Sequence, residues 1–252
     1  MEIKAGKLAV KIFKTRAEMG AAAGGDAAAK IKELIAKKGE VNMIFAAAPS
    51  QNETLATLVA AEGIDWSKVN AFHMDEYIGL SPDAPQGFGN FLKDRIFSKL
   101  PFKSVNYIYA ENETAEETCA RYTKLIKENP IDIVCLGIGE NGHIAFNDPW
   151  VADFNDSEVI KKVELDEVCR QQQVNDGCFA KLDDVPKFAL TLTVPTLYNA
   201  DYLFCTVPAP TKAEAVYKTV NNEINEDLPA TIMRNHDNAV MYCDSDSGAK
   251  LL

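Results

Sequence analysis

Apolar strand-like segments alternate with helix-like segments along the chain, and this alternation constrains the fold more than any other feature. Gly39 and Pro101 end two of the helical patterns, and Gly24-Gly25 is expected to weaken the first. Strands are predicted at 7–13, 41–49, 68–74, 105–110, 131–139, 187–198, 201–208 and 238–244, and helices at 17–39, 54–61, 87–100, 111–130 and 212–224. Such an order predicts an α/β fold with a parallel sheet covered by helices on both faces. Without a linker or repeat, we expect one domain over residues 1–252.

The charge balance excludes several classes of partner. The chain has 37 acidic and 26 basic residues and a formal net charge of −11. This excess repels nucleic acid phosphates and anionic lipid, so we expect neither as a partner. No run of about 18 apolar residues could span a bilayer, and the N-terminus lacks the core of a signal peptide. A small anionic ligand is compatible with the sequence if local donors bind it.

The cysteines indicate a reduced, cytoplasmic protein. None of the six forms a CxxC pair, and several lie in apolar runs, which is typical of buried thiols. We therefore expect no structural metal. The cysteines are Cys119, Cys135, Cys169, Cys178, Cys205 and Cys243.

Functional residues are expected in the turns that follow the strands. In open α/β sheets, ligands bind beyond the carboxyl ends of the strands. The turns in question are residues 49–54, 74–80, 137–149 and 207–212.

The turn GIGENG, residues 137–142, has the GxGxxG spacing of a dinucleotide-binding site. That site needs a helix to open at the third glycine, so that its amides meet the pyrophosphate. Here HIAFNDPW follows instead, with no helical periodicity and with Pro149 seven residues on. The sequence therefore argues against a nicotinamide or flavin cofactor.

The same turn suits acid–base chemistry. Gly137 and Gly139 allow a sharp turn and a close approach to a ligand, and they bring Asn141 and His143 to the strand end. Histidine is the natural acid or base at neutral pH, and Asp148 is near enough to orient its ring. A histidine that only bonds into the turn is the alternative reading.

Two adjacent carboxylates, Asp75 and Glu76, follow the strand predicted at 68–74. Such a pair indicates a metal site, a base or a helix start, and YIGLSPDAP after it is not helical. A carboxylate held partly out of water is more basic than one in solution, and it can then take a carbon-bound proton.

Two motifs carry a resemblance to a known family. HMDEYIGL (73–80) and GIGENGHIAFNDP (137–149) closely resemble the MDEY and NGHIAFNEP motifs of glucosamine-6-phosphate deaminases (isomerases), which share a superfamily with the 6-phosphogluconolactonases. The match runs in the same order over nearly the whole chain. It implies a modified doubly wound, Rossmann-like α/β sheet. It also implies isomerisation of an amino sugar phosphate followed by loss of ammonia, without a metal or redox cofactor.

The resemblance also implies roles for individual residues. Asp75 matches the base that moves a proton between carbons 2 and 1 of the open-chain sugar. His143 matches the acid–base group that opens the ring, and Asn141 and Asp148 match its two partners, which are Asp and Glu in the best-known members. Glu76 lies beside the base and is expected to tune it or contact the ligand. Gly139 and Gly142 are expected to approach the substrate.

The phosphate-binding elements depart from the family pattern. APSQNETL (48–55) replaces a glycine loop that reads roughly PTGGTP, and a family arginine has no match near Gly177. Lys212 matches the family's phosphate lysine. The remaining candidates for contact with the substrate are Ser50, Gln51, Asn52 and Thr54 at a helix N-terminus, and Arg170 as a replacement for the arginine.

Four functions stay open from the sequence. The first is a glucosamine-6-phosphate deaminase, and a second is a deaminase for a related sugar such as galactosamine-6-phosphate. The others are a 6-phosphogluconolactonase and a sugar-phosphate sensor without turnover. The resemblance implies a homo-oligomer in some members and a monomer in shorter ones. The tract after Asp148 lacks the arginine-rich run of allosterically activated members, so no such activation is expected.

Overall fold

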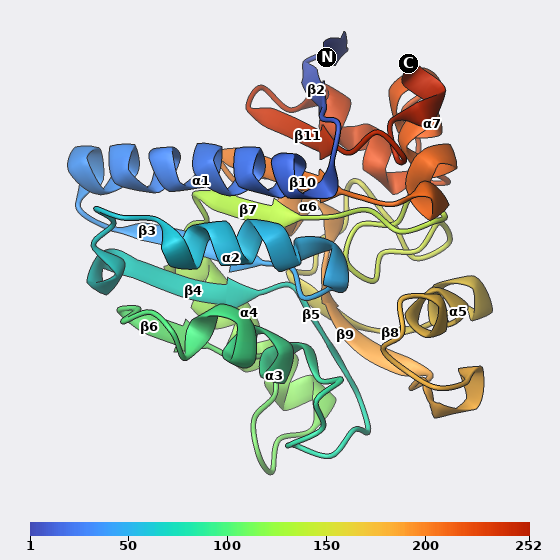
Figure 1. The fold of residues 1–252 in the computed structure, drawn as a ribbon. Coiled ribbons are helices and arrows are strands. Elements are labelled where there is room, and N and C mark those ends of the chain that lie inside the picture. The colour runs from blue at the N-terminus through green and yellow to red at the C-terminus, as the bar shows by residue number, and fades with distance from the viewer.

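The computed structural model describes residues 1–252 and has an α/β architecture built on an eight-stranded sheet. The strands lie in the order β1-β2-β11-β10-β7-β3-β4-β6, and every neighbouring pair is parallel except the hairpin β1–β2 (Figure 1). Their bounds are β1 Glu2–Ala5, β2 Leu8–Ile12, β3 Val41–Phe45, β4 Val69–His73, β6 Ser104–Asn106, β7 Ile133–Leu136, β10 Tyr202–Val207 and β11 Ala239–Cys243. The predicted mostly parallel sheet is confirmed.

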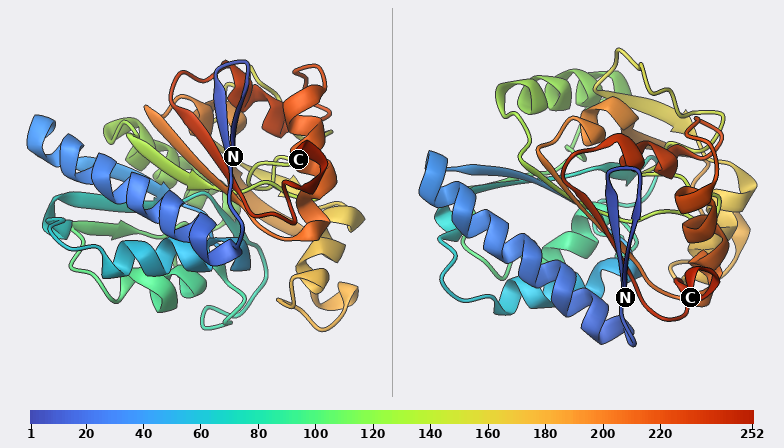
Figure 2. Two further views of the ribbon diagram at one scale, coloured as in Figure 1. Left: turned by 45° about the horizontal axis from the view of Figure 1, so that its top comes forward. Right: turned by 90° about the horizontal axis from the view of Figure 1, so that it is seen from above.

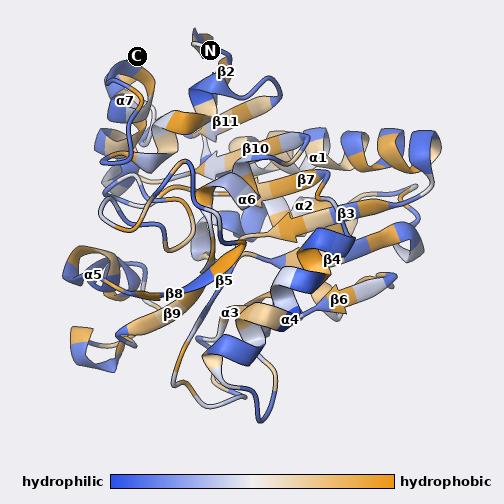
Figure 3. Ribbon diagram, turned by 180° about the vertical axis from the view of Figure 1, so that it is seen from behind, coloured by the Kyte–Doolittle hydropathy of each residue, from blue (hydrophilic) through white to orange (hydrophobic).

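Helices cover both faces of this sheet, as predicted (Figure 2). One apolar cluster contains residues of α1 (Arg16–Lys38), α2 (Asn52–Ala60) and α3 (Phe88–Leu92), which a π-helical turn, Lys93–Phe97, extends. A second contains residues of α4 (Ala115–Glu128), α6 (Val194–Tyr198) and α7 (Ala213–Asn221). The central strands are mostly hydrophobic because both of their faces are buried (Figure 3). None of the helices has the length and apolar character needed to cross a membrane.

A second, antiparallel sheet was not predicted. It has the order β5-β9-β8, with bounds β5 Asp75–Tyr77, β8 Ile160–Glu164 and β9 Phe188–Leu192, and α5 (Glu167–Asn175) follows β8. β5 begins two residues after β4 ends, so the chain passes from one sheet into the other at Met74 (Figure 1). The expected single strand at 187–198 is therefore wrong. It ends at Leu192 because Pro195, which has no amide to donate to a ladder, starts α6 instead.

Glycines in α1 bring it close to α2. The helix runs without a break through Gly24-Gly25, so the expected weak point is absent. A Cβ at Gly24 would lie 2.6 Å from Cβ of Thr57, and one at Gly20 would lie 2.2 Å from Cβ of Glu53. These residues must therefore lack a side chain for the two helices to pack at this distance. Gly25 is exposed and has nothing within 4 Å of the same position.

We predict opposite effects for alanine at the two adjacent glycines. Gly24→Ala should destabilise the protein by about 1–3 kcal/mol, because the methyl group overpacks the contact with α2. The matched control Gly25→Ala should stabilise it by about 0.5–1 kcal/mol, because alanine loses less backbone entropy in a helix. Urea unfolding of both variants measures the difference, and equal midpoints would contradict the packing role.

Candidate active site

A cavity lies at the carboxyl ends of several parallel strands, between the main sheet and α5. It has a volume of about 100 Å³ and is partly open to solvent. Its walls come from the segments after β2, β3, β4, β7 and β10 and from α3 and α5. The residues that line it are Arg16, residues 46–51, Met74, Asp75, Phe88, residues 137–139, His143, Ala145, Phe146, Gln172, Gln173, Asp176, Pro208, Ala209, Thr211 and Lys212. This is the edge at which α/β sheets bind their ligands.

Asp75 is the first residue of β5, and its buried side chain faces this cavity. Burial, and then the charge of Glu76, raise the pKa of Asp75 well above its usual range, and no hydrogen bond opposes the shift. Because side chains alternate along a strand, Glu76 points the other way. The structure thus holds Asp75 as an unpaired carboxyl group of increased basicity.

His73 fixes the backbone beneath Asp75. It is completely buried, and burial lowers its pKa to about 4, so the ring is neutral. Nε2 accepts a hydrogen bond from the amide of Ile108 at 2.9 Å. The proton therefore sits on Nδ1, which donates to the carbonyl oxygen of Asp75 at 3.0 Å. This single ring connects the start of β5 to the segment after β6.

Thr191 on β9 connects the two sequence motifs. It pairs with Asp75 across the second sheet, and its Oγ1 accepts a hydrogen bond from the amide of Phe146 at 3.1 Å. Asn147 adds a bond from Nδ2 to the carbonyl oxygen of Leu192 at 2.8 Å. The turn that carries His143 is therefore anchored to the strand beside Asp75.

Gly139 leaves the space that the ring of His143 occupies. A Cβ at position 139 would lie 2.2 Å from Cε1 and 2.4 Å from Nε2 of that ring. The amide of Gly139 also donates to the carbonyl oxygen of His143 at 2.9 Å, which closes the turn. Gly142 has a φ of 83°, and a Cβ there would meet Leu228 at 2.3 Å. Both glycines therefore make room for protein groups.

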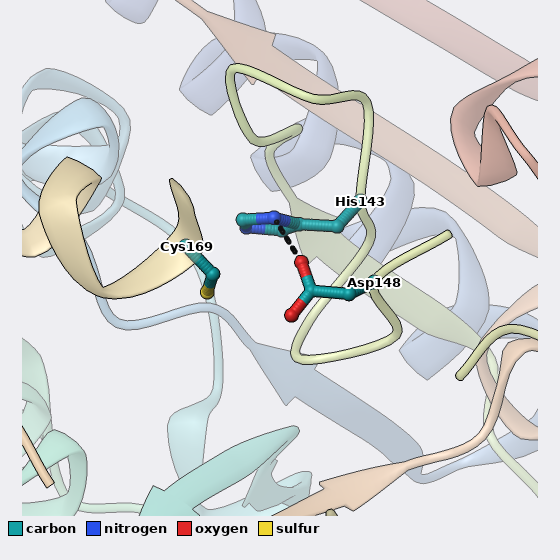
Figure 4. A group of neighbouring side chains, drawn as sticks. All are labelled: His143, Asp148 and Cys169. Atoms are coloured by element: carbon teal, nitrogen blue, oxygen red, sulfur yellow. Dashed lines mark ion pairs between the residues drawn. The ribbon is translucent and has the colours of Figure 1, made fainter. Parts of the chain in front are cut away.

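His143 lies against Asp148, as Figure 4 shows. Nδ1 is 3.1 Å from Oδ1 of Asp148, but neither Nδ1 nor Asp148 Oδ2 has an aligned hydrogen-bond partner. Asn141 donates from Nδ2 to Asp148 Oδ1 at 3.0 Å and accepts the amide of His143 at 3.0 Å. Cys169 on α5 points at the pair, and burial, followed by the charge of Asp148, raises the pKa of its thiol.

Lys212 supplies a buried cation at the same cavity. Its side chain is almost fully buried, and Nζ has no partner in the protein. Burial lowers the pKa of Lys212, against the opposing effect of the charges of Asp176 and Glu140. Ala209, at the start of this turn, has a φ of 82°, which is a strained conformation. A hydrogen bond of 3.0 Å from its backbone amide to Oδ2 of Asp244 stabilises this conformation. An unpaired buried ammonium group indicates a site for an anion.

Comparison with known proteins identifies the family. The family model for glucosamine-6-phosphate isomerases and 6-phosphogluconolactonases matches residues 14–242. The chain belongs to this family. The match includes the segments that carry Asp75, His143 and Lys212.

Two relatives named glucosamine-6-phosphate deaminase illustrate the similarity within this family. The protein from Listeria innocua is 33% identical over 229 residues, which cover 91% of this chain and 96% of the relative. The protein from an Exiguobacterium species is 34% identical over 220 residues, which cover 87% and 84%.

Solved structures confirm the family fold. A monomeric glucosamine-6-phosphate deaminase superposes with a TM-score of 0.85 at 28% identity, covering 95% of this chain and 98% of its own. The 6-phosphogluconolactonase of Trypanosoma brucei superposes with a TM-score of 0.77 at 16% identity, covering 96% and 98%. At that identity the second likeness shows the fold alone.

The family motifs do not place every expected residue at the cavity. Those that line it are Ser50, Gln51, Asp75, Gly139, His143 and Lys212. Those outside its lining are Asn52, Thr54, Glu76, Asn141, Gly142, Asp148 and Arg170. Asn141 and Asp148 still contact the His143 segment, whereas most of the others make contacts elsewhere in the protein.

Three side chains that were expected to contact the ligand instead form hydrogen bonds within the protein. They are Glu76, Thr54 and Arg170. The Glu76 carboxylate accepts the amides of Tyr77, Phe88 and Gly89 at 2.8–3.0 Å and so caps α3. Thr54 shares a buried hydroxyl bond of 3.2 Å with Thr206.

Arg170 donates to the carbonyl oxygens of Leu182 and Val185, at 2.8 and 3.0 Å through Nη2. Asn52 accepts a bond from Arg95 at 3.2 Å. Gln51 does line the cavity, but its Nε2 donates to the carbonyl oxygen of Leu136 at 3.2 Å. Arg170, the candidate replacement for the family's phosphate arginine, therefore lies outside the lining of the cavity in this arrangement.

Arg16 was not predicted as a site residue, although it lines the cavity. Its Nε donates to Glu53 at 2.8 Å, and Nη2 donates to the carbonyl oxygen of Pro49. Arg16 follows β2. The rule that ligands bind beyond the carboxyl ends of strands would have predicted it if we had applied the rule to β2. Gln172 and Gln173 were not predicted as site residues either, and the unpredicted helix α5 is what brings them to the cavity.

We predict that His73 makes stability depend on pH. The folded state keeps the ring neutral, with a pKa of about 4, whereas the unfolded chain binds a proton near 6.5. As pH falls through this window, the unfolded state takes up the proton first, so stability is lost, by about 3 kcal/mol over the full window. Above pH ~7 the contribution is complete.

The control for this prediction is His73→Gln, whose side-chain amide can donate and accept hydrogen bonds but does not titrate. Urea unfolding at several pH values between about 7 and 4 should show a steeper loss of stability for the wild type than for the variant. His143 and His236 are present in both proteins, so their contributions cancel. Parallel curves for the two proteins would contradict the buried neutral ring.

Proposed function

We propose that this chain is a glucosamine-6-phosphate deaminase that uses acid–base chemistry and no metal or redox cofactor. The observation that carries the proposal is that Asp75, His143 and Lys212 line one cavity although they come from distant parts of the sequence. The curated relatives above 30% identity, which bear that activity in their names, support it. The six free cysteines support a cytoplasmic location.

In this proposal Lys212 binds the phosphate group of the substrate. A dianion would give the buried ammonium group the partner that it lacks in the protein. Ser50, Thr211 and Arg16 line the same cavity and offer further donors. They take the place of the glycine loop and the arginine that the family pattern leads one to expect.

His143 opens the sugar ring, and Asp75 then moves the proton. With Asp148 next to Nδ1, the Nε2 atom is available for a proton exchange with the ring and anomeric oxygens. Asp75 removes the proton from carbon 2 of the open-chain aldehyde and returns it to carbon 1, while the oxygen on carbon 1 gains a proton and the ammonium group on carbon 2 loses one. The ammonium group on carbon 2 favours the ionised form of Asp75, whose pKa burial otherwise raises. The resulting imine at carbon 2 reacts with water to give the ketose phosphate and ammonia.

The proposal is tested by measuring ammonia and ketose phosphate from glucosamine-6-phosphate. Galactosamine-6-phosphate and 6-phosphogluconolactone are assayed in parallel. Ammonia from the first substrate, with no lactone hydrolysis, is the expected result. Preference for the galacto sugar, lactone hydrolysis, or binding without product would each overturn it in favour of another function.

We predict that Gly139→Ala lowers kcat/KM about 100-fold or more. The new methyl group would occupy the space of the His143 imidazole and so displace the ring. The double variant with His143→Asn shows whether the effect acts through the ring. It should be no less active than His143→Asn alone. Additive losses in the double variant would contradict this explanation.

We predict that Lys212→Met removes most of the discrimination for the phosphate group. Its kcat/KM for glucosamine-6-phosphate should fall about 10- to 100-fold, since a bond to a charged group contributes about 1.5–3 kcal/mol. Its activity toward unphosphorylated glucosamine should stay at the wild-type value. The matched control is Lys218→Met, an exposed lysine on α7, which should behave as the wild type. An equal loss for both sugars would contradict a phosphate contact.

A further inference from the structure

Three side chains that can ligate a metal converge beside the cavity. His143 and Asp148 lie in the turn after β7, and Cys169 reaches them from the first turn of α5 (Figure 4). One ligand atom from each residue lies within 4.8 Å of the other two, and all three residues are buried. The imidazole and the carboxylate have roles in the proposed reaction, but the thiol has none.

Two of these ligand groups have unused capacity for binding. Nδ1 of His143 and Oδ2 of Asp148 have no aligned hydrogen-bond partner, although the Asp148 side chain is completely buried. The thiol of Cys169 is the neighbouring donor for this carboxylate, and a thiol donates only weak hydrogen bonds. A cation between the two side chains would satisfy both atoms.

We propose that His143, Asp148 and Cys169 form a Zn²⁺ site through which the metal inhibits the enzyme. Sulfur, nitrogen and oxygen ligands together suit Zn²⁺, whereas Mg²⁺ and Ca²⁺ require oxygen. At Zn²⁺ bond lengths of about 2.0–2.3 Å, ligand atoms of a tetrahedral site lie about 3.3–3.8 Å apart. Nδ1 of His143 lies 3.1 Å from Oδ1 of Asp148, so this carboxylate, whose Oδ2 is the free atom, is already near this separation from the nitrogen. A small movement of α5 brings the sulfur to it, and water supplies the fourth ligand.

Inhibition follows from what the metal binds. Coordination occupies the imidazole of His143 and the carboxylate beside it, and the thiol of Cys169 releases its proton to solvent. The metal also ties α5, whose residues Gln172 and Gln173 line the cavity, to the turn after β7. The inhibitory effect rests on the proposed function, because it needs His143 to act in the reaction. Metal binding itself does not.

The test uses the metal-free protein, with Co²⁺ as a spectroscopic probe and Zn²⁺ as the inhibitor. Cys169→Ser removes the sulfur ligand, and Cys169→Ala serves as a second variant if the first does not fold. Cys178→Ser is the matched control, since Cys178 lies just after α5 and is partly buried but outside the cluster. Mg²⁺ is the control cation.

Wild type and Cys178→Ser should show the absorption band of a cobalt–thiolate bond, and Cys169→Ser should lack it. Zn²⁺ should suppress ammonia release reversibly in the first two proteins, while Cys169→Ser should need more than about tenfold higher Zn²⁺. Mg²⁺ should have no effect.

A cobalt–thiolate band that persists in Cys169→Ser would overturn the site, and unchanged Zn²⁺ sensitivity of that variant would overturn the proposed mechanism of inhibition. Metal binding without inhibition of an active enzyme would also overturn its inhibitory role. If the metal-free wild type releases no ammonia, the proposed function fails, but the cobalt spectrum still decides whether the metal site exists.

Discussion

The site depends on one buried neutral histidine at the point where the chain leaves the main sheet. His73 bonds the carbonyl oxygen of Asp75 and the amide of Ile108, and so fixes the first residue of β5 next to the segment after β6. β5 then pairs with β9, and Thr191 on β9 holds the turn that carries His143. A chain of hydrogen bonds and strand pairing thus joins two motifs that lie about seventy residues apart in sequence. Their side chains share a cavity because the two sheets meet there.

The cavity keeps charged groups without protein partners. Lys212 is a buried cation without a hydrogen-bond partner in the protein, and Asp75 is a buried acid that accepts no hydrogen bond from it. Burial of each group without a partner costs stability, and each gains a partner when an ammonium sugar phosphate binds. Because the chain has a net charge of −11, an anionic ligand can bind only where a local positive group such as Lys212 attracts it. The arrangement is therefore suited to a substrate with a cationic amine and an anionic end.

Much of the fold was predictable from the sequence, because apolar strands and helical patterns alternate in order. The second sheet was not, for physical reasons. β5 has only three residues, and β8, with the sequence IKKVE, is too charged to read as a buried strand. α5, with the sequence EVCRQQQVN, lacks a clear apolar stripe. These elements are stabilised by contacts with one another, which periodicity along one segment does not report.

The positions of Asp75, His143 and Lys212 at one edge followed from the rule of strand ends and from the family motifs. The motifs could not indicate that Glu76 caps α3 or that Gly139 makes room for an imidazole, because both depend on tertiary contacts. The departures from the family pattern at residues 48–55 and near Gly177 were visible in the sequence. That Arg16 lines the cavity, and that Arg170 is held by backbone carbonyls, required the structure.

The central claim is that Asp75 is the base that handles the proton on carbon 2. Its direct test is the exchange of that hydrogen with deuterium from solvent, followed by NMR, with substrate affinity measured on the same samples. For Asp75→Asn, exchange should fall about 10²- to 10⁴-fold with substrate affinity nearly unchanged. The control variant Asp176→Asn, which changes another acidic residue that lines the cavity, should still catalyse the exchange. Exchange by Asp75→Asn at the wild-type rate would contradict the account.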